Sequence, residues 1–242
     1  MLKRSIMVHQ PHFFPWLPYI ARMAVSEYFI VFDLAQYKKR YFHNRTKILR
    51  LDNAEEWFTL PISGNSKDSM NKMNIGLQNL NIKKMKRRLS HYYNKYPYYN
   101  IYWEKLDSFF NYDLLSNLTL PNINMKSIEL TFNLLDIPMP QIIYIPEIEK
   151  KQNYHSKQLM LDQIIQQDVK YFLTGWGASK MEEIIDKAIY NEKGILVKHM
   201  NKDTFDEEYN SNGLFAIHWI MLYGAKTVKQ FLTRNQSKFF DA

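Results

Sequence analysis

The sequence contains no cysteine, and this absence excludes several kinds of chemistry. Disulfide bonds, cysteine nucleophiles, thiolate metal sites and iron–sulfur clusters all need the missing thiol. Glycine is also scarce, with 7 residues in 242. Each glycine is therefore expected where the backbone or a close contact requires it. Any catalytic chemistry must come from imidazole, amide, hydroxyl, carboxylate or cationic side chains.

Long apolar runs are missing as well, and none approaches the length of a membrane-spanning helix. The first residues are basic, but the apolar stretch after them is interrupted by His9, Gln10, Pro11 and His12. This pattern is unlike a signal peptide. We therefore predict a cytoplasmic protein without membrane insertion.

The net charge of +8 does not by itself indicate a nucleic-acid partner. The basic residues are spread along the chain apart from the run Lys83–Arg88, and no nucleic-acid-binding module is recognisable. Within that run, Met85, Leu89 and Tyr92 have a helical spacing. We interpret the lysines and arginines as the solvated side of an amphipathic helix, and we expect no nucleic-acid partner.

Short apolar runs alternate with helical patterns, which predicts an α/β fold. Five runs are predicted strands: residues 5–9, 28–33, 141–145, 169–174 and 194–199. Because helical patterns separate these runs, we expect crossover connections and an open, mainly parallel, Rossmann-like sheet. A helical segment at about residues 78–136 is inserted between the second and third strands, after a predicted β-hairpin at 45–62. We interpret residues 1–242 as one domain, since no repeat or low-complexity linker divides them.

The segment His9–Trp16 places two histidines, an amide and an indole directly after the first predicted strand. Ligands of doubly wound sheets bind beyond the carboxyl ends of the strands. Histidine suits proton transfer near neutral pH, and the amide of Gln10 can orient a substrate. The alternative is a structural turn in which the imidazoles only satisfy backbone groups. We assign His9, His12 and Gln10 to catalysis, and Trp16 and Tyr19 to substrate binding.

Polar side chains also follow the second predicted strand. Asp33 ends that strand and is assigned to the catalytic group, with Gln36, Lys39, Asn44 and Arg45 assigned to substrate binding. Arginine can hold phosphate or carboxylate with two parallel hydrogen bonds. The alternative is a solvated charged loop. We expect phosphorylated ligands near Arg45 and Lys39 rather than along the basic helix.

The loop after the fourth predicted strand contains Gly175, Gly177 and Lys180. Its glycines allow backbone N–H groups to approach an anion at a helix N-terminus. The loop lacks the spacing of a Walker motif or a full dinucleotide fingerprint, and a tight turn is the alternative. We assign the three residues to substrate binding and expect all three loops to line one cleft.

Metal chemistry is not indicated. His9 and His12 have a ligand-like spacing, but no compact cluster of histidines and carboxylates accompanies them. We predict no metal site, and the sequence does not identify a cofactor.

Several segments together resemble the WbqC-like family in sequence and in order. They are HQPHFFPWLPYIARM, EYFIVFDLAQYKKRYFHNRTKI, TLPISG, YNKYPYYNIYWEKL, YFLTGWGASKM and FAIHWIMLYGAKTV. The QPxxxPW core with the following DxxQ and NR elements is the most specific part. This sequence departs from the family at Pro18, where glycine is usual before Tyr19, and at Trp176 in the glycine loop.

The resemblance implies a role in the biosynthesis of O-antigen and related surface glycans. It further implies modification of a nucleotide-activated amino sugar by transfer of an acyl or aminoacyl group to its amine, with an acyl- or aminoacyl-carrier protein as a candidate donor. In that scheme His9 or His12 acts as the base, and Arg45, Lys39 and the glycine loop hold phosphate. Two alternatives stay open: an ATP-using ligase or nucleotidyltransferase of the same pathway, and a non-catalytic module that binds sugar nucleotides.

Overall fold

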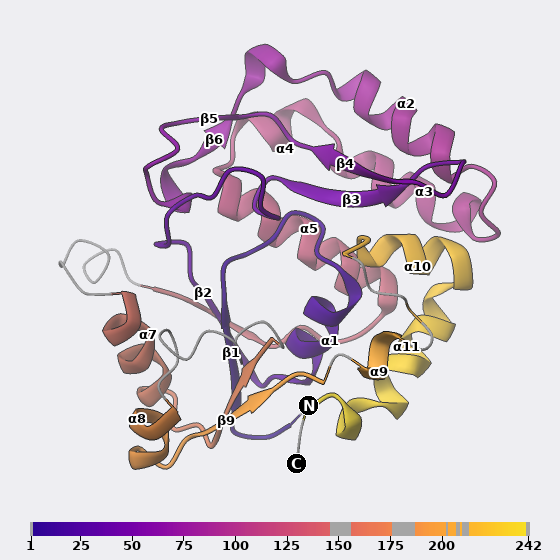
Figure 1. Cartoon of the computed structure of the whole chain (residues 1–242). Coiled ribbons are helices and arrows are strands. Elements are labelled where there is room, and N and C mark those ends of the chain that lie inside the picture. The colour runs from indigo at the N-terminus through magenta and orange to yellow at the C-terminus, as the bar shows by residue number, and fades with distance from the viewer. Residues whose placement is uncertain are drawn as a thin grey trace.

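A five-stranded parallel sheet forms the centre of the computed structural model, which describes residues 2–145, 156–175, 187–201, 203–206, 209 and 213–240 (Figure 1). Its strands are β1 (Ser5–His9), β2 (Tyr28–Val31), β7 (Gln141–Tyr144), β8 (Tyr171–Thr174) and β9 (Leu196–His199). They lie in the order β7-β2-β1-β8-β9, and every neighbouring pair is parallel. The predicted α/β fold with an open parallel sheet is confirmed.

Helices cover both faces of this sheet. Helices α1 (Leu17–Val25), α5 (Leu120–Leu135), α10 (Ala216–Tyr223) and α11 (Ala225–Arg234) contribute to one apolar cluster, and α7 (Ser156–Ile165) and α8 (Lys187–Glu192) contribute to a second. Neighbouring strand residues divide between the clusters, because side chains alternate along a strand. Met7 and Phe29 belong to the first cluster, whereas Ile6 and Ile30 belong to the second. The first cluster lies on the face that His9 shares with Met7.

The predicted insertion lies between β2 and β7, and it adds a second layer above the sheet (Figure 1). It begins with the antiparallel hairpin β3 (Arg45–Leu49) and β4 (Glu55–Thr59), followed by the short pair β5 (Ile62–Ser63) and β6 (Asn74–Ile75). Two short 3₁₀ turns, Met70–Lys72 and Leu77–Asn79, flank β6. Helices α2 (Ile82–Tyr93), α3 (Tyr99–Phe109), α4 (Tyr112–Ser116) and α5 complete the layer. Near the C-terminus, α9 (Asp203–Asp206) and the 3₁₀ turn Gln236–Lys238 pack beside α11. In the described part of the chain, no helix is long and apolar enough to cross a membrane.

The basic helix α2 is amphipathic, as the sequence predicts. Met85 and Leu89 are buried, and the buried stripe continues to Tyr93, whereas Tyr92 is only half-buried. Residues four apart lie on one side of a helix, so Tyr93 completes the row better than Tyr92. Lys86 forms an ion pair with Asp107 at 2.8 Å. The solvated side of this helix is therefore held to the rest of the insertion.

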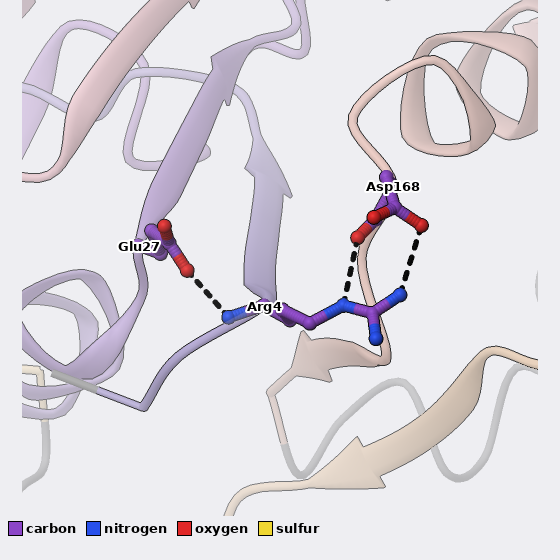
Figure 2. A network of polar contacts seen from close by, with 3 residues as sticks. All are labelled: Arg4, Glu27 and Asp168. Carbon is purple, nitrogen blue, oxygen red and sulfur yellow. Dashed lines mark hydrogen bonds and ion pairs between the residues drawn. The ribbon is translucent and has the colours of Figure 1, made fainter.

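The amino ends of β1, β2 and β8 are joined by Arg4 (Figure 2). The Arg4 backbone N–H donates to the carboxylate of Glu27, and its guanidinium donates to the Asp168 carboxylate at 2.8 Å and to the Asp168 carbonyl at 3.1 Å. The side chains of Arg4 and Asp168 are 57% and 92% exposed. This network lies at the edge of the sheet opposite the carboxyl ends of the strands.

We expect Arg4→Ala to lower the free energy of unfolding by less than about 1 kcal/mol, because water screens an exposed ion pair. The backbone hydrogen bond to Glu27 does not depend on the Arg4 side chain. Urea denaturation of the variant and the wild type measures the difference. A loss several times larger would show that the guanidinium is essential for holding β8 against β1.

Candidate functional site

The strand order reverses between β1 and β8, which places the topological switch point of the sheet there. Starting from β1, the chain builds outward through β2 to β7 and then returns to the other side of β1 with β8 and β9. Strands β1 and β8 pair at Ser5 with Tyr171 and at Ile6 with Phe172, so their pairing stops before the carboxyl ends of both strands. Sheets of this class bind ligands at such a reversal. The residues that follow β1 and β8 are therefore the first candidates for a site.

His9 is the last residue of β1, and its side chain is half-buried. The His9 Nδ1 atom lies 2.8 Å from the carbonyl oxygen of Gln10. A carbonyl only accepts hydrogen bonds, so Nδ1 carries the proton and Nε2 of the neutral ring keeps its lone pair. The Tyr19 hydroxyl, from α1, donates to the same carbonyl at 3.1 Å. The loop backbone thus fixes the tautomer of His9.

His12 is fully buried and enclosed by rings. Their centroids lie 4.7 to 6.0 Å from that of His12 and belong to His9, Trp16, Tyr19, Tyr41, Phe42 and His43. Neither ring nitrogen of His12 has a hydrogen-bond partner among the described residues. Buried polar groups are nearly always paired. His12 is therefore an unsatisfied donor and acceptor inside an aromatic cage.

His43 orients the side chain of Gln10. The backbone N–H of Lys38 donates to His43 Nδ1 at 3.2 Å, so the proton of the neutral ring lies on Nε2. That nitrogen is 2.8 Å from Gln10 Oε1 and donates to it. Asn124 of α5 donates from Nδ2 to the backbone carbonyls of both Pro11 and His43, at 2.8 and 2.6 Å. These bonds hold the loop after β2 against the loop after β1.

All three imidazoles are uncharged at neutral pH. Burial, and next the charge of Arg22, lower the pKa of His9 to about 3. Burial and the neighbouring His9 hold the pKa of His12 well below its usual range. Burial lowers the pKa of His43 to about 4. Neutral rings can accept protons and donate hydrogen bonds, as a base or a polarising group must.

Arg22 of α1 is a cation whose charge acts on His9 and His12, and its side chain is buried. Its guanidinium carbon lies 5.9 Å from the centroid of the Tyr19 ring. A Cβ atom added to Gly175 would lie 2.7 Å from Arg22 Nη1, so the guanidinium lies directly against the backbone after β8. Burial lowers the pKa of Arg22 to about 10, which leaves it charged at neutral pH.

The structure brings together five of the predicted site residues, namely His9, Gln10, His12, Trp16 and Tyr19, with Gly175 adjacent through Arg22. The other residues predicted after β2 lie differently. Asp33 is buried beyond the end of β2, and its charge acts on Tyr144 at the end of β7. Gln36 and Lys39 are exposed. Gly177 and Lys180 lie outside the described residues.

Asn44 and Arg45 have contacts within the insertion. Asn44 is buried, accepts from the Tyr37 hydroxyl at 2.8 Å and donates to the Leu60 carbonyl at 2.7 Å. The Arg45 guanidinium carbon lies 3.7 Å from the centroid of the Trp57 ring, and its Nη2 donates to the Arg40 carbonyl. The Asn44 amide therefore holds the loop that carries His43.

Sequence reasoning did not single out Arg22, His43 or Tyr41. A signal for Arg22 existed, because it is an isolated cation in an apolar helix and lies three residues after Tyr19, on the same side. His43 directly precedes the Asn-Arg pair that was singled out. Its partner Gln10 is 33 residues away, so only the folded chain shows the contact.

Outside this cluster, the described residues meet the requirements of a surface pocket but not those of a metal site. No group of three or more histidine and acidic side chains in the described ranges could hold a metal ion. A depression on the insertion is lined by residues of α3, α4 and α5, including Lys105, Phe109, Leu114, Lys126 and Glu129. None of the predicted site residues lines it.

A parallel sheet whose strand order reverses is typical of the doubly wound class of α/β proteins. In this chain neutral imidazoles and a buried guanidinium lie beside the reversal. The chain belongs to the WbqC-like protein family, which matches residues 10–227. Searches of curated proteins and of solved structures found no match. Of the two departures from the family, Trp176 lies outside the described residues, and Pro18 is the second residue of α1, where the first turn of a helix tolerates proline.

Proposed function

We propose that this protein is a transferase of surface-glycan biosynthesis that joins an acyl or aminoacyl group to the amine of a nucleotide-linked amino sugar. Membership of the WbqC-like family supports the polysaccharide role. The position of the histidine cluster at the switch point supports chemistry on a bound ligand. The substrate is assigned from the family's setting, and the roles of the residues are assigned from the geometry.

The observation that carries the proposal is the fixed tautomer of His9. Its Nδ1–H is held by the Gln10 carbonyl, so the free lone pair is on Nε2 at the carboxyl end of β1. An amine attacking a carbonyl must lose a proton, and a positioned imidazole can take it. The new C–N bond forms as the C–S bond of a thioester donor breaks. The proton taken by His9 then passes to the departing thiolate.

The neighbouring side chains have distinct roles in this scheme. Gln10, whose Oε1 accepts from His43, keeps its amide N–H groups for the acyl oxygen. Trp16 and Tyr41 contribute aromatic walls around His12. Asn44 is a positioning residue, since both ends of its amide bind within the protein.

The proposal is tested by incubating the protein with nucleotide-linked amino sugars and an acyl thioester, and following the sugar nucleotide by mass spectrometry. We expect its mass to rise by that of the acyl group, with release of one thiol. A product that forms only with ATP, accompanied by AMP or pyrophosphate, would instead support the ligase or nucleotidyltransferase. Binding of the sugar nucleotide without conversion by any donor would support the non-catalytic module.

A further inference from the structure

We infer that Arg22 forms an oxyanion-binding site at the switch point between β1 and β8. The site takes a phosphate or carboxylate group. It is formed by the Arg22 side chain of α1 and by the backbone that follows β8. Assigning this oxyanion to the substrate rests on the proposed function, but the presence of the site does not.

The first support is that Arg22 has no opposite charge beside it. Its side chain is 6% exposed, and it has no ion pair in the described part of the chain. Its Nε is buried without a hydrogen-bond partner among the described residues. A buried, unpaired charge destabilises a fold, because the ion loses water and gains no partner. A guanidinium placed in this way is expected to receive its counter-charge from a ligand.

The second support is the close approach of Arg22 to Gly175. A Cβ atom at position 175 would lie only 2.7 Å from Arg22 Nη1. Gly175 follows the last residue of β8, beyond the part of β1 and β8 that is paired. Gly175 thus lets the guanidinium lie against the backbone at the place where doubly wound sheets bind phosphate-bearing ligands.

The third support is the character of the surrounding groups. The phenols of Tyr19 and Tyr41 lie near Arg22, and burial raises the pKa of both, so they are uncharged at neutral pH, as are the neighbouring His9 and His12. The Tyr19 hydroxyl and the His9 Nδ1–H are held by the Gln10 carbonyl, whereas the Tyr41 hydroxyl and a ring N–H of His12 can donate to an anion without repelling it. The guanidinium itself offers a planar fork that matches two oxygens of one group.

An anion at Arg22 would also prepare His9 for proton transfer. The positive charge of Arg22 is one cause of the low pKa of His9, after burial. A bound oxyanion offsets this charge, so the pKa of His9 rises when substrate is present. The base would then be strengthened only in the complex.

Two variants and a matched control test the site. Arg22→Met keeps the length and the apolar stem of the side chain and removes the charge. Gly175→Ala keeps the charge, but its methyl group displaces the flexible end of the guanidinium. Arg4→Met removes an arginine at the opposite edge of the sheet. Each protein is titrated calorimetrically with uridine diphosphate, inorganic phosphate and malonate, and its Tm is measured without ligand.

We expect Arg22→Met and Gly175→Ala to weaken binding of the probe about 10- to 100-fold, the range for a lost charge-assisted hydrogen bond. Arg4→Met should bind as the wild type does. Without ligand, Arg22→Met should have a Tm about 2–4 °C higher, because an unpaired buried charge is gone. Binding of uridine diphosphate and phosphate identifies a phosphate site, and binding of malonate alone identifies a carboxylate site.

The inference is overturned if no probe binds the wild type, or if Arg22→Met binds as tightly as the wild type. It is also overturned if Arg22→Met lowers Tm, since Arg22 would then be a structural residue. His9→Ala separates this inference from the proposed function, because it should leave anion binding intact. If Arg22→Met loses binding while His9→Ala keeps full transfer activity, the oxyanion site stands and the catalytic base does not.

Discussion

His9→Ala is expected to slow group transfer by about 10²–10⁴-fold, the usual effect of losing a general base. The imidazole is replaced by a methyl group, so the Nε2 lone pair that accepts the proton in this scheme is lost. The fold should survive, because His9 is half-buried and, among the described residues, its side chain forms a hydrogen bond only with the adjacent residue. Initial rates of the mass-spectrometric assay measure the loss, and circular dichroism reports the fold.

His91→Ala is the matched control, because it removes an exposed histidine of α2. Its rate should equal that of the wild type. His43→Gln should cause a smaller loss than His9→Ala, since His43 acts through Gln10 and not on the substrate. A His9→Ala variant that keeps its rate within a few-fold of the wild type would remove His9 from the mechanism.

The second large effect is a steep loss of stability on acidification. Burial lowers the pKa of His9 to about 3 and of His43 and His218 to about 4, and it holds the pKa of His12 well below its usual range. Below about pH 6.5 these histidines bind protons in the unfolded chain but stay unprotonated in the folded chain. Each such histidine therefore lowers the free energy of unfolding by about 1.4 kcal/mol per pH unit, and four together by roughly 5 kcal/mol per pH unit.

The sign of this effect is unambiguous, because a depressed folded-state pKa makes stability fall as the pH falls from about 6.5 towards 4. Since domains are stable by about 5–15 kcal/mol, the protein should unfold cooperatively at about pH 5. Urea denaturation at a series of pH values measures the slope. His218→Gln should reduce the slope by about a quarter. A stability that is constant from pH 7 to 5 would show that these imidazoles are protonated in the folded chain.

The sheet was predictable because its strands are short apolar runs separated by helical patterns. β1 is bounded as predicted, whereas β2 ends at Val31, two residues before Asp33. Within the predicted helical segment, α3 and α4 are separate helices that are divided at Phe110 and Asn111. Local periodicity locates such elements well, but their ends depend on caps and tertiary contacts.

The site was predictable only in part. His9, Gln10 and His12 lie in one loop directly after a strand, so the rule for doubly wound sheets selects them without further information. The contact of Arg22 with Gly175 joins α1 to the end of β8, across 153 positions of sequence (175 − 22). A local sequence pattern covers far fewer residues, so it cannot reveal a contact between two such distant positions. Charge density favours Lys39 and Arg45. Arg22 is the stronger candidate for an anion because it is buried, whereas Lys39 is exposed and the Arg45 guanidinium contacts the Trp57 ring and the Arg40 carbonyl.

A crystal structure of the protein with a nucleotide-linked amino sugar tests the central claim most directly. We expect the amine of the sugar within about 3.2 Å of His9 Nε2, or joined to it through one water. A phosphate should lie beside Arg22 at the carboxyl ends of β1 and β8. A sugar nucleotide bound instead in the depression lined by Lys105 and Lys126, away from His9, would contradict the account.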